Sequence, residues 1–375
     1  MSSSTADIIG REDPNDLDSI LGITNTDVDE IIHDVNASVD TLFTWNYERS
    51  RPALSKLYEK AKTSQWNVTT DLDWSIDVDQ EKEVSNTPGI GMAVEAGLID
   101  LSQTPVANWG KKEWTDFEIE SSNWSLSQFL HGEQGALLCT ARIVETVPWI
   151  DAKYYAATQV MDEARHVEVF GRYLYEKMSS QYPINAHLRM LLDDIVSDSR
   201  WDITYLGMQI MVEGLALAAF GFMHMLTQEP LLKKLLRYVM SDEARHVAFG
   251  VLSLQEYYQG LNQDEIRERQ EFAFEAALRM RDRFLQQEVW ERQGVNPIEV
   301  IKFMRENGPQ GADPFQHMLF SKIVPNCKKL GLLDAGDGWL RARFTEIGVI
   351  QFEDWADTGE EYESLDEVAK DRAAS

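Results

Sequence analysis

Apolar side chains recur every three or four residues along most of the chain beyond residue 123, which predicts amphipathic α-helices. Prolines and helix-capping residues divide this region into segments. The expected fold class is therefore all-α. The predicted long helices lie at about 125–146, 149–178, 185–197, 202–226, 230–260 and 264–292, and shorter helices follow Pro297.

The region before residue 123 has a less regular pattern. Asn25 or Thr26 can cap a helix over residues 28–45. Proline is favoured in the first turn of a helix, so Pro52 can open a second helix that ends near Trp66. The remaining stretch contains several tryptophans and turn residues, which indicates loops and short helices over residues 67–121.

The two ends of the chain are polar. Residues 1–22 are expected to form a loose, polar N-terminal arm. Residues 353–375 hold nine acidic and two basic side chains, which predicts a solvated acidic tail. The part between them, residues 23–352, is expected to be one helical domain.

One stretch, from Tyr205 to Leu226, is long and apolar enough to cross a membrane. Arg200 and Asp202 precede it closely, and Glu213 lies at its middle. A helix that is apolar on every side is also what the centre of a large helical bundle requires. We therefore predict a core helix rather than a membrane span.

The sequence Asp-Glu-Ala-Arg-His occurs twice, at residues 162–166 and 242–246. Each copy places its glutamate 30 residues after an isolated glutamate in an apolar run. Together the two copies supply four carboxylates and two imidazoles, which is the ligand set that a four-helix bundle uses to hold two metal ions. The candidate ligands are Glu133, Glu163, His166, Glu213, Glu243 and His246.

Helical geometry brings these side chains to one level. Pro148 lies midway between Glu133 and Glu163, and a turn there gives two antiparallel helices whose glutamates end at the same height. The second copy repeats this arrangement around residue 228. Four buried carboxylates without cations would cost several kcal/mol each. A two-metal site is therefore favoured over a solvated helix face.

The remaining motif residues are expected to support the imidazoles. A metal-bound imidazole usually donates its other N–H to a carboxylate. We expect Asp242 to support His166 and Asp162 to support His246 across the bundle, and Arg165 and Arg245 to pair with these acids.

Two pairs of residues at equivalent places could also serve the centre. Gln159 and Gln209 lie four residues before Glu163 and Glu213, so their amides can hydrogen-bond the carboxylates. Tyr155 and Tyr205 lie eight residues before the same glutamates. Packing in the core is the favoured interpretation for both tyrosines.

The charge balance limits the possible partners. The chain has 35 basic and 63 acidic side chains and a formal net charge of -28. Such a surface repels phosphate backbones and anionic lipids, so neither nucleic acid nor a membrane is an expected partner. Only Cys139 and Cys327 are present, too few for a disulfide framework, and no signal peptide is apparent. Both features favour the cytoplasm.

The doubled Glu-x28-Asp-Glu-x-Arg-His motif over residues 123–260 resembles the ferritin-like diiron-carboxylate oxidoreductases. Within them it looks like the arylamine N-oxygenases and the hydroxylase subunits of multicomponent monooxygenases. The resemblance implies a ferritin-like four-helix bundle with flanking helices. It also implies that one iron is bound by Glu133, Glu163 and His166, that the other is bound by Glu213, Glu243 and His246, and that one glutamate bridges both.

The chain departs from each of these relatives. Arylamine N-oxygenases have a further histidine ligand one turn before the second motif's glutamate, where this chain has Val239. Multicomponent hydroxylases are longer and need partner subunits. Ribonucleotide reductase small subunits have a radical tyrosine one turn after the first ligand histidine, where this chain has Phe170. Acyl-carrier-protein desaturases have an acidic partner, which a net charge of -28 would oppose.

The function that the resemblance implies is a dioxygen-activating, non-haem diiron oxidase or monooxygenase that acts on a small organic substrate. Its cofactor would be two iron ions, with manganese or a mixed manganese–iron pair as alternatives, and dioxygen would be the co-substrate. Electrons would come from a ferredoxin or a reductase, and the apolar 205–226 helix could support a homodimer. The alternatives are a radical protein like the ribonucleotide reductase small subunit, an iron-storage protein, and a metal-free helical interaction protein.

Overall fold

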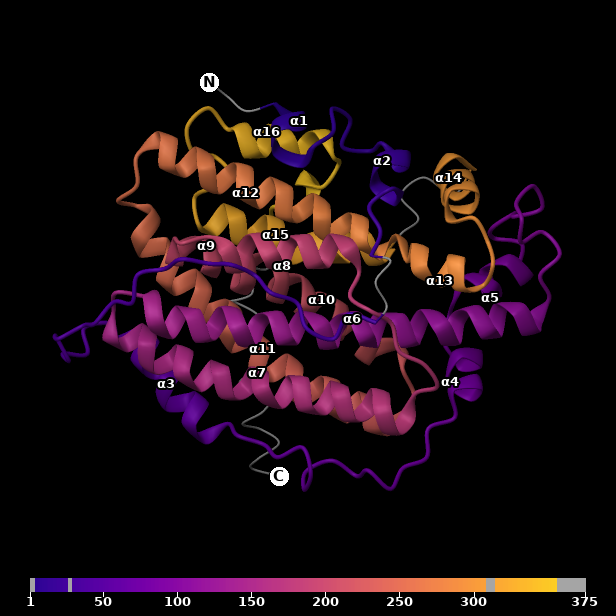
Figure 1. The fold of residues 1–375 in the computed structure, drawn as a ribbon, viewed down its shortest axis with the longest axis horizontal. Helices are drawn as coiled ribbons and strands as arrows, with labels where there is room; N and C mark the ends of the chain where they lie inside the picture. The colour runs from indigo at the N-terminus through magenta and orange to yellow at the C-terminus, as the bar shows by residue number, and fades with distance from the viewer. Residues whose placement is uncertain (1–3, 26–28, 308–313, 356–375) are drawn as a thin grey trace.

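The computed structural model describes residues 4–25, 29–307 and 314–355, and every regular element in these ranges is helical. The all-α prediction is therefore confirmed. Figure 1 shows long antiparallel helices at the centre of the molecule and shorter ones around them. The last 20 residues of the predicted acidic tail, 356–375, lie outside the described part.

Four long helical segments form the central bundle (Figure 1). The first hairpin consists of α6 (Lys111–Thr146) and α7 (Ile150–Lys177), which pack closely along their length. The second consists of a continuous segment from Trp201 to Leu226 and of α11 (Pro230–Tyr258). The turns around Pro148 and before Pro230 are where the sequence predicts them. Both hairpins therefore reverse midway between their candidate ligands.

Shorter helices cover this bundle. On one side α12 (Gln263–Asp282) and α15 (Pro314–Lys329) contact the second hairpin. On another side α3 (Pro52–Thr63) contacts α7 and α11. The others are α1 (Thr5–Ile9), α2 (Leu17–Leu21), α4 (Gln80–Asn86), α5 (Ile90–Glu95), α8 (Ala186–Ser197), α13 (Gln287–Arg292), α14 (Pro297–Asn307), α16 (Trp339–Glu346), and the 3-10 turns η2 (Arg283–Leu285) and η3 (Ile350–Phe352).

The segment from Trp201 to Leu226 contains a π-helical stretch that the periodicity does not predict. It consists of α9 (Trp201–Tyr205), the π-helical η1 (Leu206–Val212) and α10 (Glu213–Leu226). The backbone N–H of Glu213 donates to the carbonyl of Met208, five residues earlier. π-Helical turns are rare and occur frequently at functional sites, because the wider turn rotates the residues that follow it. Here the rotation ends at a candidate ligand.

Gly250 lets α11 approach this π-helical stretch. A Cβ atom at Gly250 would lie 2.6 Å from Cβ of Gln209, closer than side chains tolerate. We expect Gly250→Ala to destabilise the protein by about 1–3 kcal/mol through overpacking. Gly171→Ala, on α7, is the control: its Cβ would meet nothing nearer than Leu130 Cδ1 at 3.9 Å, so we expect stabilisation by about 0.5–1 kcal/mol. Denaturant unfolding of both variants checks this, and equal effects would contradict it.

Three sequence predictions about helices are wrong. Residues 29–45, predicted as part of a helix, contain no helix. This segment is held by contacts to distant helices instead: the backbone N–H of Leu42 donates to the carbonyl of Glu145, and Thr44 Oγ1 donates to the carbonyl of Pro148. The predicted 264–292 helix is broken after Asp282, and α6 begins at Lys111 rather than near residue 125.

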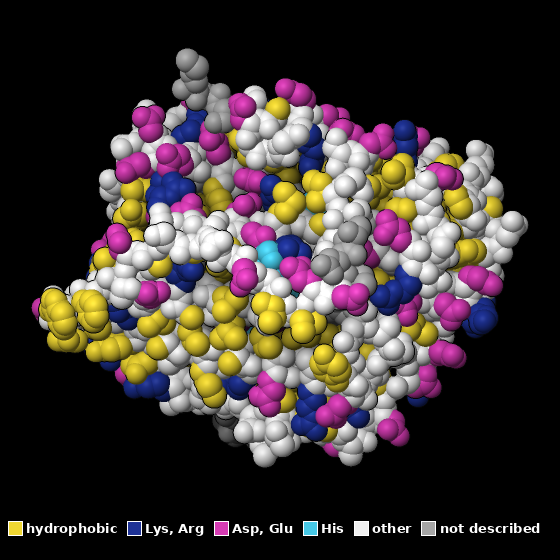
Figure 2. Space-filling view, in the orientation of Figure 1, with side chains coloured by type: hydrophobic (Ala, Val, Ile, Leu, Met, Phe, Trp, Pro, Cys, Tyr) yellow, Lys and Arg dark blue, Asp and Glu magenta, His cyan; other side chains and the backbone are white. Residues whose placement is uncertain are grey.

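Segment 29–50 leaves apolar side chains exposed. Figure 2 shows hydrophobic side chains gathered at the left end of the view and in a band across this face. The rings of Phe43 and Trp45 stack on each other with their centroids 5.3 Å apart. The exposed apolar residues of the segment are Ile31, Ile32, Leu42, Phe43, Trp45 and Tyr47.

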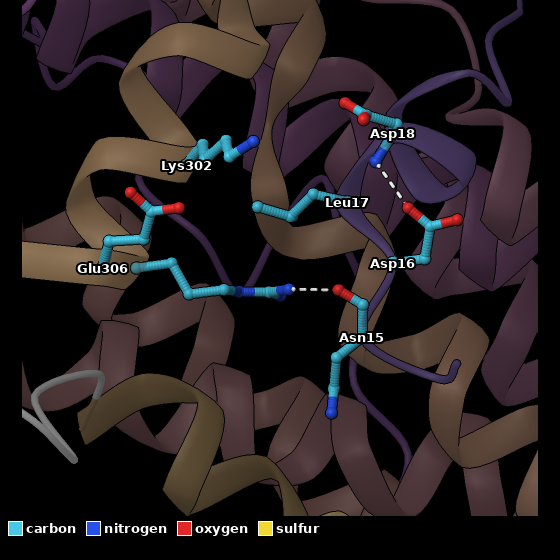
Figure 3. A pocket seen from close by; sticks show the side chains of 7 residues that line it. Asn15, Asp16, Leu17, Asp18, Lys302 and Glu306 are labelled. Atoms are coloured by element: carbon cyan, nitrogen blue, oxygen red, sulfur yellow. Dashed lines mark hydrogen bonds between the residues drawn. The ribbon is translucent and has the colours of Figure 1, made fainter.

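The expectation of a loose arm at residues 1–22 is wrong for the described part, residues 4–22. Ile20 and Leu21 are buried, and the Arg11 guanidinium pairs with Asp282 at the end of α12. A cavity of about 240 Å³ lies where this segment meets α14 (Figure 3). Arg305 Nη1 donates to the carbonyl of Asn15 across it, 3.0 Å away. None of the candidate metal ligands lines this cavity.

The apolar segment Trp201–Leu226 is long and apolar enough to span a membrane, but 78% of its most apolar window is buried inside the fold. Phe220 packs there against Phe129 of α6 and Phe170 of α7, with ring centroids 4.7 and 5.6 Å away. The segment is therefore a core helix of the bundle, as predicted. Most of its apolar surface is therefore used within the chain.

Candidate metal centre

The structure brings all six candidate ligands together in the middle of the bundle. Each of its four long segments contributes at least one, and all six side chains are at most 5% exposed. They form two overlapping groups whose ligand atoms lie within 4.8 Å of one another. The first group is Glu133, Glu163, His166 and Glu243, and the second is Glu163, Glu213 and His246.

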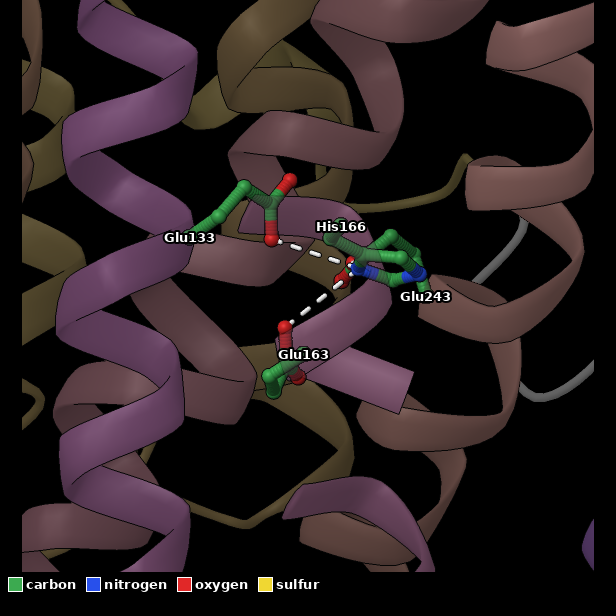
Figure 4. A group of neighbouring side chains, drawn as sticks. All are labelled: Glu133, Glu163, His166 and Glu243. Carbon is green, nitrogen blue, oxygen red and sulfur yellow. Dashed lines mark hydrogen bonds and ion pairs between the residues drawn. The ribbon is translucent and has the colours of Figure 1, made fainter. Parts of the chain in front are cut away.

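The imidazole of His166 faces three carboxylates, two of which are joined to it by dashed lines in Figure 4. Its Nδ1 atom lies 3.3 Å from Glu133 Oε2 and 3.4 Å from Glu163 Oε2. The same atom lies 3.0 Å from Glu243 Oε1. A single ring nitrogen can carry only one proton, so it cannot satisfy three carboxylates by hydrogen bonding.

His246 has matching surroundings on the other side. Its Nδ1 atom lies 3.0 Å from Glu163 Oε1 and 3.6 Å from Glu243 Oε2. Glu213 Oε2 lies 3.9 Å away. Glu163 and Glu243 thus each present one oxygen to each imidazole, so both are placed to bridge two ions. The resemblance implies that one glutamate bridges the two ions, whereas the structure places two glutamates where they could do so.

The donor set suits a pair of divalent cations. Four buried carboxylate oxygens have no hydrogen-bond donor among the described residues, and neither does His246 Nδ1. Unpaired buried carboxylates are costly, whereas bound cations would satisfy them all. Carboxylate oxygens and imidazole nitrogens are suitable ligands for iron and manganese. The four oxygens are Glu163 Oε2, Glu213 Oε2, Glu243 Oε1 and Glu243 Oε2.

The pKa values of the cluster reflect the close approach of its buried carboxylates. Burial, and then the nearby Glu243 carboxylate, raise the pKa of Glu133 to about 8. Burial and the Glu163 carboxylate raise the pKa of Glu213 well above its usual value. Burial alone would lower the pKa of His166, but the Glu133 carboxylate and the bond to Asp242 raise it well above normal. Without cations, protons compensate the negative charge.

The contacts that the sequence predicts between the two motifs are present. His166 Nε2 lies 3.2 Å from Asp242 Oδ2, and His246 Nε2 lies 3.3 Å from Asp162 Oδ2. Each acid comes from the other hairpin. When Nε2 carries the proton and donates it to the acid, Nδ1 has a free lone pair directed at the carboxylate cluster. This is the tautomer in which the imidazole can bind a metal ion through Nδ1.

The two motif arginines bind the same acids. Arg165 pairs with Asp162, and its Nη2 atom lies 3.3 Å from Asp242 Oδ2. Arg245 pairs with Asp242, and its Nη2 atom lies 3.4 Å from Asp162 Oδ2. These two acids and two guanidiniums form a buried four-residue ion-pair cluster beside the imidazoles.

Two residues just after α3 belong to this network and were not identified from the sequence. Trp66 Nε1 donates to Asp242 Oδ2 over 2.8 Å, and Gln65 Nε2 donates to Asp162 Oδ1 over 3.3 Å. The periodicity indicated only that Trp66 lies on the apolar face of its helix. Trp66 is 8% exposed, so a hydrogen-bonded path leads from near the surface through Asp242 to His166.

The two glutamines at equivalent positions have different roles. Gln159 Nε2 donates to Glu163 Oε1 at 3.0 Å and to Glu213 Oε1 at 2.9 Å. The Gln209 amide has no hydrogen-bond partner among the described residues. Gln209 lies in the π-helical stretch, where positions four apart no longer share a face. The prediction is therefore correct for the first copy of the motif and wrong for the second.

The aromatic residues near the centre are packed in the core. Tyr155 and Tyr205 are fully buried and pack against Phe249, with ring centroids 4.4 and 5.0 Å away. Phe170 occupies the position where a radical tyrosine would be expected, and it is also fully buried. No phenol stands at that place.

A small cavity of about 20 Å³ adjoins the cluster between α6 and α10. Glu133, Glu213 and Glu243 line one part of it, and Phe129 and Phe220 line another. The volume is that of about one water molecule. Three of the candidate ligands therefore border a space for about one water molecule.

No protein-family model matches this chain, and no curated protein matches it. Several solved structures of R2-like ligand-binding oxidases are similar to it. One variant with an anaerobically reconstituted Mn/Fe cofactor is 20% identical over 76% of this chain and 94% of its own, with a TM-score of 0.45. A second such variant is 18% identical over 76% of this chain and 94% of its own, with a TM-score of 0.49.

Proposed function

We propose that this protein is a dimetal oxidase or monooxygenase that activates dioxygen and acts on a small organic substrate. The observation that carries the proposal is the buried cluster of four carboxylates around two imidazoles. Its oxygens lack hydrogen-bond donors, and its imidazoles are held by acids from the opposite hairpin. A purely structural core would have no use for four buried acids at one level.

Two iron ions are the proposed cofactor, and a manganese–iron pair, named for the similar oxidases, would suit the same donors. Glu133 and His166 would hold one ion, and Glu213 and His246 would hold the other. Glu163 and Glu243 would be shared between the two ions. When bound, the pair would supply the electrons that reduce dioxygen. The arylamine N-oxygenases remain the proposed functional model, although the place of their additional histidine holds the buried Val239.

The protein's own groups hold this centre in place. Asp242 and Asp162 fix the orientation of the two imidazoles through Nε2. Gln159 holds Glu163 and Glu213 in one arrangement by donating to both. Phe129, Phe170 and Phe220 pack on the α6, α7 and α10 side and keep bulk water away from the cluster. Water exclusion protects a strong oxidant from side reactions.

We propose a ferredoxin or a reductase as the electron donor and the cytoplasm as the location. The path from Trp66 through Asp242 to His166 supports electron delivery to the centre from a docked partner. Cys139 and Cys327 are both buried free thiols, which supports a reducing compartment. The radical-protein and storage alternatives have no supporting feature of their own, since Phe170 cannot form a tyrosyl radical.

Metal analysis combined with oxygen uptake tests the proposal. Anaerobic loading with ferrous iron is expected to give two ions per chain, and exposure to air is expected to consume dioxygen. Mössbauer spectroscopy of the oxidised protein would show a coupled ferric pair. Bound iron far below two per chain, or no oxygen consumption by the fully loaded protein, would refute the proposal; hundreds of ions per assembly would indicate storage instead.

Metal uptake is expected to release protons and to weaken as the pH falls. In the metal-free protein the pKa of Glu133 is about 8, so its carboxyl carries a proton at pH 7, and the pKa of Glu213 is also raised well above its usual value. A cation must displace the protons that these ligands carry, so affinity rises with pH through about 8, where Glu133 loses its proton, and falls as the pH is lowered. Calorimetry in two buffers of different ionisation enthalpy counts the released protons. Glu133→Gln should release fewer, and a pH-independent affinity would contradict the prediction.

A further inference from the structure

Three rings, those of His166, Trp66 and Tyr238, are stacked beside the metal centre. The Trp66 ring lies nearly parallel to the His166 imidazole, with centroids 6.4 Å apart and planes at 22°. Trp66 also stacks on the phenol ring of Tyr238, with centroids 5.1 Å apart and planes at 11°. Exposure rises along the stack, because His166 is fully buried, Trp66 is 8% exposed and Tyr238 is partly exposed. The stack therefore leads from a candidate ligand toward solvent.

The middle ring of the stack has charged neighbours of both signs. Trp66 Nε1 donates to Asp242, and this carboxylate stabilises the positive charge that an indole acquires when it loses an electron. The Arg165 guanidinium, whose Cζ lies 5.3 Å from the centroid of the Trp66 ring, opposes that charge. Trp66 is therefore suited to passing an electron to the centre, but not to keeping the positive charge afterwards.

Tyr238 differs from Trp66 because its oxidised form is neutral. A phenol that loses an electron also gives up its O–H proton, and the partial exposure of Tyr238 lets water accept this proton. The ammonium group of Lys234, 5.8 Å from the centroid of the phenol ring, does not repel a neutral product. An electron vacancy on Trp66 is therefore expected to move outward to Tyr238.

The core beside the centre contains side chains that a strong oxidant would damage. Met208 and Met211 are buried in η1, which ends directly before the candidate ligand Glu213. Oxidation turns methionine into a polar sulfoxide and disrupts a packed core. A path that supplies electrons to the centre whenever substrate is absent would prevent this damage.

We propose that Tyr238 is the surface end of an electron path that discharges the metal centre when no substrate consumes its oxidant. The proposal rests on the proposed function, which supplies the dioxygen-derived oxidant. In each discharge the centre gains one electron from Trp66, and Trp66 regains one from Tyr238. The Tyr238 O–H bond breaks, its proton passes to water and a phenoxyl radical remains. A soluble reductant such as ascorbate restores the phenol by supplying one electron and one proton.

Electron paramagnetic resonance of rapidly frozen samples tests the proposal. The iron-loaded, reduced protein is mixed with air-saturated buffer without substrate, and the parent protein should show a transient tyrosyl radical. In Tyr238→Phe this signal should be lost, and peptide mass spectrometry should find several-fold more oxidised Trp66, because the vacancy stays there. The substitution removes only a hydroxyl group, so the rings can still stack and Tm should be unchanged.

A second variant and a matched control make the result specific. Trp66→Phe leaves Tyr238 intact but interrupts the path, so the tyrosyl signal should be lost there as well. Tyr257→Phe is the control, because Tyr257 is a partly exposed tyrosine of the same helix whose ring packs on Trp201, with centroids 4.6 Å apart. It should keep the tyrosyl signal and the parent level of Trp66 oxidation.

Iron content and oxygen uptake of the same samples separate this inference from the proposed function. A parent protein that binds two ions and consumes dioxygen without forming a tyrosyl radical would overturn the inference alone. An undiminished tyrosyl signal in Tyr238→Phe or in Trp66→Phe would do the same. A parent protein that consumes no dioxygen when loaded would overturn the proposed function and this inference with it.

Discussion

Glu163→Ala is expected to abolish binding of the metal pair and, with it, oxygen uptake. Glu163 is the residue shared by both ligand groups, with one oxygen 3.4 Å from His166 Nδ1 and the other 3.0 Å from His246 Nδ1. Its loss therefore removes a donor from both ions at once. Since removing a mere supporting residue costs about 10–100-fold in metal affinity, the loss of a shared ligand should cost more. Iron per chain after desalting, and oxygen-electrode traces, measure the effect.

The matched control is Glu168→Ala, an exposed glutamate on the same helix. It should bind two ions and consume dioxygen as the parent protein does. Circular dichroism of both variants shows whether the helices are retained. A Glu163→Ala protein that keeps two ions per chain would mean that Glu163 is not a ligand and that the geometry of the cluster has been misinterpreted.

Asp242→Ala is expected to destabilise the protein by about 3–5 kcal/mol, because it removes the nearer counter-ion of the buried Arg245 and leaves only Asp162, 3.4 Å away. Asp242 is buried and pairs with Arg245, and it also accepts from Trp66 and contacts His166. Nearby Arg245 and His166 hold the pKa of Asp242 below its usual range although burial opposes them. Urea unfolding of the metal-free variant measures the loss separately from metal binding.

Two further variants make this second result interpretable. Asp337→Ala breaks an exposed ion pair with Arg267 and should cost at most about 1 kcal/mol. Asp242→Ala combined with Arg245→Met removes both charges of the buried pair and should recover part of the lost stability. A loss of less than about 1 kcal/mol in Asp242→Ala would show that the ion-pair cluster contributes little to folding.

The centre could be predicted from the sequence because its geometry is local to each hairpin. Thirty residues from Glu133 to Glu163, with Pro148 midway, leave little freedom once both segments are helical. The contact of Asp242 with His166 followed from the same regularity, because the two copies of the motif face each other. Because the motif occurs twice with the same spacing, each residue of one copy is expected to face its counterpart region in the other copy. The contacts between the copies can therefore be assigned from the sequence alone.

Other features depend on contacts that no local pattern records. The stretch from Leu206 to Val212 is apolar except for Gln209, so no polar face marks the wider π-helical turn that gives Gln209 different surroundings from Gln159. The helix break at Gln286 has no proline or glycine to announce it. Trp66 donates to Asp242, which lies 176 residues further along the chain.

The exchange of acids between the hairpins makes the two halves of the chain mutually dependent. Asp242 contacts His166 and Asp162 contacts His246, so each hairpin supplies candidate ligands and receives from the other hairpin the acid that orients its imidazole. Neither half alone can present a correctly aimed imidazole. The two halves must therefore pack together before metal ions can bind tightly. A newly synthesised chain is expected to bind metal only after the segment around residue 246 has packed against the first hairpin.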